Sequence, residues 1–156
     1  MNLLEENNMD FSYERILVAV DGSEYAEHTY RKGVELAKRN NAELHIIHVF
    51  DIRYYPSDYS ALKKRAEEEG IKLLNRYKEE AEKHEGMKKV ETILKKGSPK
   101  VLVSKTAEEI DADLILVGAS GLYAVEQILL GSVTESIIRN ATCDVLVVRK
   151  PKDFKA

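Results

Sequence analysis

The stretch LILVGASGLYAVEQILLGSVTE, from Leu114 to Glu135, contains the signals from which the fold can be predicted. It begins with branched apolar residues over 114–117, a run too short for a helix, which predicts a buried strand. Glycine then interrupts the apolar run and recurs along the stretch, at Gly118, Gly121 and Gly131. The expected structure is therefore a strand followed by a glycine-containing loop.

A helix is expected directly after the last of these glycines. Ser132 and Glu135 occupy the two ends of Ser-Val-Thr-Glu, which fits a capping box with Ser132 at the N-cap. Apolar residues follow at Val133, Ile137 and Ala141, and this spacing of four predicts a helix with one buried face.

A strand, a glycine-containing loop and a helix start together suit an anionic ligand. Glycine lets backbone N–H groups approach a phosphate, and a helix start adds unpaired donors. The helix dipole supplies only ~1 kcal/mol, whereas micromolar binding needs roughly 8 kcal/mol, so a ligand must also bury an apolar group such as a nucleobase. The alternative is that the glycines only shape a tight loop, and their spacing alone does not decide between the two.

The pattern Gly118-x2-Gly121-x9-Gly131-Ser132 resembles the ATP-binding signature of the universal stress protein family, G-x2-G-x9-G-(S/T). The resemblance extends over residues 13–149. It implies a nucleotide-responsive regulatory protein of the stress response that binds ATP, together with the Mg²⁺ that accompanies ATP. A nucleotide-independent protein-interaction module of the same fold is the alternative.

Hydrophobic patterns predict that strands and helices alternate along the whole chain. The expected strands cover 15–20, 43–50, 88–95, 114–117 and 144–149, and the expected helices cover 24–39, 61–85, a segment starting at Ser98-Pro99 and a segment starting at Ser132. This alternation predicts an α/β fold of one domain, a Rossmann-like open parallel five-stranded sheet with helices on both faces. The resemblance implies the strand order 3-2-1-4-5. We expect the domain to cover 14–150, with tails at 1–13 and 151–156.

Ligands of open parallel sheets bind beyond the carboxyl ends of the strands, where the strand order reverses. The strand order implied by the family places the first and fourth strands side by side at that point. Asp21 follows the first strand and the glycine loop follows the fourth. Asp21 could cap the next helix, with Glu24 three residues later, or it could accept hydrogen bonds from a ribose, the role that the resemblance implies. The two roles could also coexist.

The resemblance further maps two groups of contacts onto this chain. The adenine pocket corresponds to Ala19, Val20, Val49 and Val117, and the phosphate cradle to the backbone of Gly118, Gly121, Gly131, Ser132 and Val133 with the hydroxyl of Ser132. Many family members place His or Arg between the first two glycines, where this chain has Ala119 and Ser120. The loop therefore lacks a cation of its own, which predicts at most slow ATP hydrolysis.

The sequence contains neither a nucleophile–base pair nor a metal-ligand pattern at a recognisable spacing. The four histidines fall on different elements or, for His45 and His48, on opposite faces of one strand. No catalytic residue and no protein-built metal site is predicted. The loop after the second strand holds Tyr54, Tyr55 and Tyr59, which could close over a nucleotide, pack on their own domain or pack at a subunit contact.

Composition and sequence features limit the binding partners and the cellular compartment that we expect for this chain. A net charge of −3 gives no reason to expect nucleic acid or an anionic membrane, and a single cysteine excludes an internal disulfide. The chain has no apolar run of the ~20 residues that a membrane span needs, and its first ten residues lack signal-peptide features, so a cytoplasmic protein is expected.

The apolar edge strand Val145–Val148 could pair with a strand of another chain, and the resemblance implies a homodimer through it. The alternative is a short edge protected by Arg149, Lys150 and Pro151.

Overall fold

The structure, a computed structural model, describes residues 10–51, 53, 60–120 and 130–151. In chain order these residues form strands and helices that alternate: β1 (Arg15–Ala19), α2 (Glu24–Asn40), β2 (Glu43–Phe50), α3 (Ser60–Glu82), β3 (Lys89–Lys96), α4 (Pro99–Glu109), β4 (Leu114–Gly118), α5 (Ser132–Asn140) and β5 (Asp144–Val148). The predicted order of elements is confirmed.

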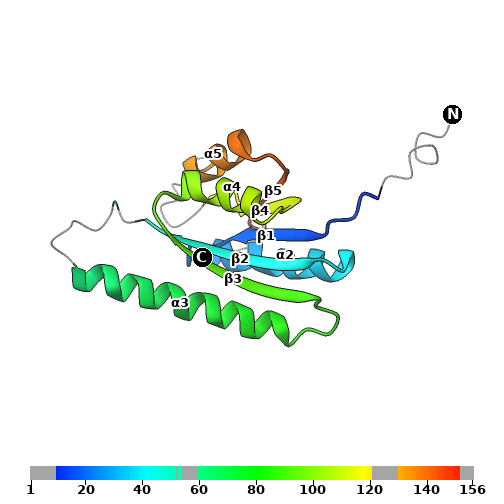
Figure 1. The fold of residues 1–156 in the computed structure, drawn as a ribbon, viewed down its shortest axis with the longest axis horizontal. Coiled ribbons are helices and arrows are strands. Elements are labelled where there is room, and N and C mark those ends of the chain that lie inside the picture. Colours follow the sequence, from blue (N-terminus) through cyan, green and yellow to red (C-terminus); the bar gives the residue numbers. More distant parts are fainter. Residues whose placement is uncertain (1–9, 52, 54–59, 121–129, 152–156) are drawn as a thin grey trace.

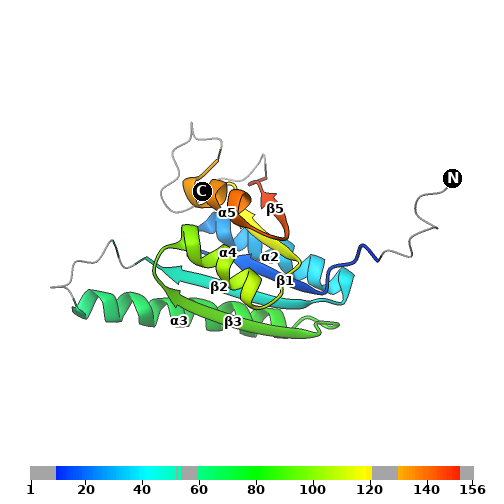
Figure 2. The ribbon, with the colours of Figure 1, turned by 45° about the horizontal axis from the view of Figure 1, so that its top comes forward.

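The strands form one parallel sheet of order β3-β2-β1-β4-β5, as predicted. Helices α2 and α3 cover one face, and α4 and α5 cover the other (Figures 1 and 2). The sheet therefore reverses its order between β1 and β4, and β3 and β5 are its edges. Among the described helices, none is long and apolar enough to cross a membrane.

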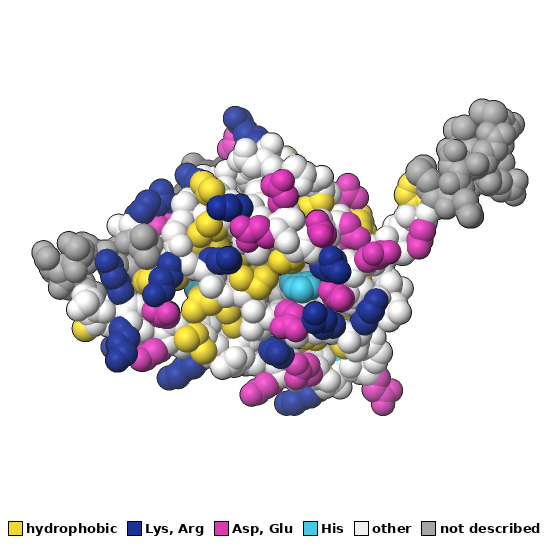
Figure 3. All heavy atoms as spheres, viewed as in Figure 1, with side chains coloured by type: hydrophobic (Ala, Val, Ile, Leu, Met, Phe, Trp, Pro, Cys, Tyr) yellow, Lys and Arg dark blue, Asp and Glu magenta, His cyan; other side chains and the backbone are white. Residues whose placement is uncertain are grey.

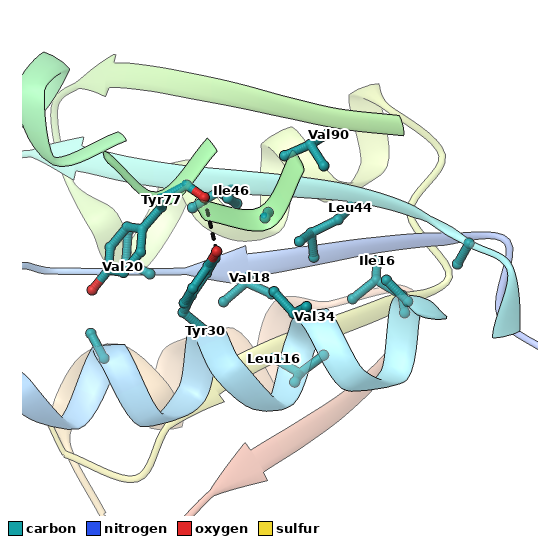
Figure 4. Close-up of a cluster of buried hydrophobic side chains, with 14 of the residues drawn as sticks. Ile16, Val18, Val20, Tyr30, Val34, Leu44, Ile46, Tyr77, Val90 and Leu116 are labelled. Carbon is teal, nitrogen blue, oxygen red and sulfur yellow. Dashed lines mark hydrogen bonds between the residues drawn. The ribbon is translucent and has the colours of Figure 1, made fainter. Parts of the chain in front are cut away.

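The core has two parts, one on each face of the sheet. The larger part packs α2 and α3 against alternate residues of β1, β2 and β4, and Figure 4 shows it. Its largest side chains are Tyr30 and Tyr77, whose ring centroids lie 4.3 Å apart. The hydroxyl of Tyr30 donates a 2.8 Å hydrogen bond to the main-chain carbonyl of Tyr77, which satisfies a buried polar group (Figure 4).

The smaller part of the core lies under α4 and α5. Its buried residues are Leu17, Ile47, Val103, Ala107, Ile115, Val117 and Ile137. Because successive residues of a strand point to opposite faces, the apolar runs of β1, β2 and β4 supply both parts at once. Because both faces of these strands are buried, they lack the alternation of polar and apolar residues seen in sheets that have one solvent-exposed face.

Most element boundaries agree with the sequence pattern to within a few residues. Helix α4 begins as predicted, with Ser98 in an extended conformation at the N-cap and Pro99 directly after it. Helix α3 ends at Glu82, three residues before the predicted end at 85. Ala141, predicted on the buried face of the last helix, is instead its C-cap and has an extended backbone.

Candidate functional site

The carboxyl ends of the neighbouring strands β1 and β4 lie side by side, at the same end of the sheet. The register pairs Val18 of β1 with Leu116 of β4, so both strands finish at the same level. On the far side of β4, the N–H of Ala119 donates to the carbonyl of Val148, 2.9 Å away. The chain therefore leaves β1 and β4 in opposite directions, and an opening for a ligand is expected between the two departing segments.

The turn after β1 contains Asp21, Gly22 and Ser23. Ser23 is the N-cap of α2, and its Oγ accepts a 3.1 Å hydrogen bond from the N–H of Ala26. Of the two roles considered for Asp21, the helix cap therefore belongs to Ser23 instead. Gly22 adopts a φ of +84°, which inserts a turn between Asp21 and the helix.

The carboxylate of Asp21 shapes this turn instead of the helix start. Its Oδ1 accepts a 3.0 Å hydrogen bond from the N–H of Ser23. Asp21 is partly exposed just beyond the carboxyl end of β1.

The start of α5 also differs from the prediction. Gly131, with φ −69° and ψ 153°, is the N-cap, Ser132 is the first helical residue, and no side chain caps the helix. The predicted capping box of Ser132 and Glu135 was therefore wrong by one position. The physical reason lies in two main-chain bonds of Gly131: its N–H donates to the carbonyl of Ala119 over 2.7 Å, and its carbonyl accepts the N–H of Glu135 over 3.0 Å.

Three N–H groups at the start of α5 precede the first hydrogen bond within the helix. They belong to Ser132, Val133 and Thr134, because Glu135 is the first residue to donate to a carbonyl one turn back. Such groups form an anion site when they face a ligand. Gly131, by contrast, already donates its N–H to the carbonyl of Ala119. Its role at the site is therefore to leave room for a ligand and to direct the chain into α5.

Gly118, the last residue of β4, is closely surrounded. A Cβ added to Gly118 would lie 3.2 Å from the carbonyl oxygen of Ser120 and 3.3 Å from Oγ1 of the buried Thr29. Glycine is therefore favoured here by the close approach of α2 and of the following loop, and not by a left-handed backbone. Gly121 lies outside the described residues, as do Tyr54, Tyr55 and Tyr59.

The apolar residues mapped to the base divide between the two faces of the sheet. Ala19, Val49 and Val117 belong to the core part under α4 and α5, together with Val133 from the first turn of α5. Val20 points the other way, into the core part between α2 and α3, where it is 4% exposed (Figure 4). A base on the α4–α5 side would thus contact the side chains of the first group and only the backbone of Val20.

The histidines do not converge. The Nδ1 of His48 lies 2.9 Å from the carbonyl oxygen of Val20, and the Nε2 of His45 lies 3.1 Å from Oε2 of Glu43. Among the residues that the structure describes, no cluster of His, Cys, Asp or Glu could hold a metal ion.

Sequence reasoning missed two residues that shape this edge. Thr134 donates its hydroxyl to the carbonyl of Gly118 over 2.6 Å, and His48 contacts the carbonyl of Val20. Thr134 had a sequence signal, since a polar residue occurs there on the otherwise apolar face of a predicted helix. His48 had none, because its partner is a main-chain atom on another strand.

A surface hollow lies at the opposite end of the strands, near their amino ends. Its lining comes from residues 10–14 and 112–113, which precede β1 and β4, and from 142–144, where β5 begins. It contains none of the predicted site residues. The strand order, and not this hollow, locates the candidate site.

The fold and the arrangement at its strand ends define an α/β protein with an open parallel sheet. A helix N-terminus lies where the strand order of that sheet reverses, between β1 and β4. The family model described as the universal stress protein family matches residues 12–149. The chain belongs to the universal stress protein family.

Individual relatives support this assignment. A curated Staphylococcus aureus (strain USA300) protein that carries the universal stress protein name is 49% identical over 154 residues, which cover 92% of this chain and 90% of the relative. Among solved structures, the universal stress protein UspA from Lactobacillus plantarum has a TM-score of 0.84 at 25% identity, covering 90% of this chain and all of that one. A universal stress protein solved in complex with cAMP has a TM-score of 0.61 at 28% identity, covering 88% of this chain and 97% of that one.

Proposed function

We propose that this protein binds ATP beyond the carboxyl ends of β1 and β4 and acts as a nucleotide-responsive regulatory protein. The observation that carries the proposal is the arrangement at these strand ends. Asp21 follows β1, the α5 N-terminus follows β4, and a group of apolar side chains lies on the adjoining face. The complex of a related universal stress protein with cAMP supports an adenine nucleotide as the ligand.

Each part of ATP has a counterpart in this arrangement. The ribose hydroxyls would donate to the carboxylate of Asp21, and the phosphates would accept from the N–H groups of Ser132 and Val133. The base would contact Ala19 and Val49, which are both partly exposed, beside the buried Val117. Burial of the base is the larger contribution, since apolar area yields roughly 25 cal/mol per Å² while the helix dipole adds ~1 kcal/mol or less.

Basic side chains elsewhere could replace the cation that the glycine loop lacks. On the face in Figure 3, Lys and Arg gather at the left, where the strands finish, and Asp and Glu are more frequent at the right, where they begin. Lys100 lies in the first turn of α4, and its carbonyl accepts from Oγ of Ser136 in α5 over 2.9 Å. This hydrogen bond joins the first turn of α4 to α5 on the side proposed for the phosphates.

Mg²⁺ would arrive as the counterion of the ATP phosphates. Asp51, a carboxylate directly after β2, is paired with Arg53, whose Nη2 lies 2.6 Å from Oδ2 of Asp51. The described residues thus offer no preformed magnesium cage. Because the part of the chain that the structure describes places no general base beside the proposed phosphates, we expect hydrolysis to be slower than about one turnover per second.

We also propose a homodimer through the edge strand β5. Val145 and Val147 are only partly buried within one chain. Ile138 of α5 is 46% exposed and lies two residues from Ser136, so it points away from α4 and towards the outer edge of β5. Sedimentation velocity should give a dimer at micromolar concentration, and Ile138→Glu should weaken it while Ile71→Glu, on the similarly exposed Ile71 of α3, should not. A monomeric wild type would contradict this proposal.

The test of nucleotide binding uses the purified chain without added ligand. Denaturation followed by ion-exchange chromatography would show whether an adenine nucleotide is carried through purification, and calorimetric titration with Mg-ATP would measure affinity. Asp21→Ala and Gly131→Val should abolish or greatly weaken binding. Asp10→Ala is the matched control, because Asp10 makes the same turn hydrogen bond, 2.9 Å from the N–H of Ser12, far from the site.

Two results would decide against the proposal. A titration that stays flat to millimolar Mg-ATP would favour the nucleotide-independent interaction module. Equal losses in Asp21→Ala and Asp10→Ala would show that binding does not use the β1 end.

A further inference from the structure

His48 connects the end of β1 to β2 at the point where the chain turns towards Asp21. Strand β1 ends at Ala19, which is paired with Ile47. The next residue, Val20, still donates its N–H to the carbonyl of Ile47 over 2.9 Å. Its carbonyl faces Nδ1 of His48, also at 2.9 Å.

This contact replaces a regular bond of the ladder. In a parallel pair, a residue bonds to the two residues that flank its opposite number. Continuation of the register would place Val20 opposite His48, so its carbonyl would accept from the N–H of Val49. The imidazole takes that carbonyl instead, and the chain can leave the sheet without an unsatisfied buried acceptor.

The chemistry of the contact identifies the donor. A carbonyl oxygen can only accept, so Nδ1 of His48 carries the proton in this arrangement. The bond is formed by the neutral Nδ1–H tautomer and by the imidazolium alike.

Helix α3 holds the imidazole from the other side. A Cβ on the buried Gly70 would lie 3.0 Å from Cδ2 of His48 and 3.2 Å from Cδ1 of Leu94. One turn further along α3, Cδ2 of Leu73 lies 3.8 Å from the position of a Cβ on Gly22. The same helix therefore supports the histidine ring and the turn that carries Asp21.

We propose that His48 is a positioning residue for the ribose contact of Asp21. The Val20 carbonyl belongs to the peptide group that joins Val20 to Asp21, so the imidazole sets the plane of that peptide and the direction in which the Asp21 side chain leaves it. This inference rests on the proposed ATP site. It assigns His48 to the nucleotide site although its side chain lies on the α3 side of the sheet, away from the proposed base.

The test compares two nucleotides that differ only in the ribose hydroxyls. Calorimetric titrations with Mg-ATP and with Mg-2′,3′-dideoxy-ATP would be made on the wild type, His48→Leu and His48→Asn. Asn offers an amide N–H near the position of Nδ1, whereas Leu offers no donor. We expect His48→Leu to weaken ATP about five- to tenfold, the size of one hydrogen bond, to leave dideoxy-ATP unchanged, and His48→Asn to restore most of the ATP affinity.

A double-mutant cycle with Asp21→Ala gives a second readout. If His48 acts through Asp21, His48→Leu should have no further effect on ATP binding once Asp21 is Ala. Gly70→Ala serves as a second variant, because it pushes on the ring while His48 is retained, and it should produce the same selective loss of ATP affinity.

The outcomes separate this inference from the proposed function. Equal losses for ATP and dideoxy-ATP in His48→Leu, or no loss for either, would overturn the positioning role while the ATP site stands. Absence of ATP binding by the wild type would overturn the proposed function and this inference with it. Thermal unfolding of each variant would show that the comparison is made between folded proteins.

Discussion

The hydroxyl of Thr134 donates a 2.6 Å hydrogen bond to the carbonyl of Gly118. This bond joins the first turn of α5 to the last residue of β4, sixteen positions earlier in the chain. Thr134 is 3% exposed, so water cannot replace the bond easily. The two ends of the glycine loop are thereby held together independently of the loop itself.

Thr134→Val should weaken the connection between these two ends, although the bond from the N–H of Gly131 to the carbonyl of Ala119 remains. The substitution keeps the shape of the side chain but leaves the Gly118 carbonyl without its donor, which should lower the free energy of unfolding by about 1–3 kcal/mol. ATP affinity should fall as well, because the helix N-terminus is held less firmly against β4. Urea denaturation and nucleotide titration would measure both effects, and Thr134→Ser, which retains the hydroxyl, should preserve most of each. Equal effects of Val and Ser would contradict this role.

Lys100→Ala should weaken binding of the phosphates. The Lys100 ammonium acts on the strand ends: the pKa of Asp51 is lowered chiefly by its hydrogen bond to Arg53 and to a smaller extent by Lys100. Removing this charge should weaken ATP by about three- to tenfold at low salt, and the effect should shrink as salt screens the charges. Adenosine should bind unchanged. Lys105→Ala, on the exposed side of the same helix, is the control, and a loss of equal size there would point to net charge instead of position.

Glu43 should make stability depend on pH in the acid range. Hydrogen bonds from His45 and Arg15 lower the pKa of Glu43 from 4.5 to about 2. A lowered folded-state pKa means that the stabilisation is complete above about pH 4.5 and is lost as the pH falls towards 2. With the side chain 18% exposed, the contribution is on the order of 1 to 3 kcal/mol.

Glu43→Gln should therefore flatten the acid limb of the stability curve. Denaturation midpoints measured between pH 2 and pH 6 would show the wild type losing stability more steeply than the variant. Glu91→Gln, at a 45% exposed carboxylate on the adjacent strand β3, should keep the wild-type slope. Parallel curves for wild type and Glu43→Gln would contradict the assignment.

The fold could be predicted because its signals are local and repeated. The apolar runs of β1, β2 and β4 indicate strands buried on both faces, and the alternation with amphipathic helices then restricts the topology. Even the weaker run at 88–95 was placed correctly, since its mixed polarity suits the edge strand that β3 is.

The details of the site were less predictable because they depend on main-chain partners far away in sequence. Ser132 and Glu135 match a capping box by spacing, but Gly131 takes the N-cap because Ala119 holds its N–H. Asp21 likewise matches a cap, yet the positive φ of Gly22 moves that role to Ser23. Side-chain spacing cannot reveal which main-chain groups are already occupied.

Gly33→Ala should destabilise the protein although it places a better helix former inside α2. In an exposed helix interior, this change gains roughly 1 kcal/mol. Here the new Cβ would overlap Cγ2 of Val18, which is fully buried in β1, and would lie 3.6 Å from Cδ1 of Leu44. Overpacking of a tight core costs about 1–3 kcal/mol, so we expect a net loss in the free energy of unfolding.

A cycle with Val18→Ala separates the clash from other causes. Val18→Ala alone should destabilise by leaving a cavity, while the double variant should recover part of the loss because the Gly33→Ala methyl group then occupies vacated space. The two changes should therefore be less than additive in urea denaturation. Additive losses would show that α2 does not approach β1 closely at this position, and the packing that places Asp21 and Thr29 beside the candidate site would need to be revised.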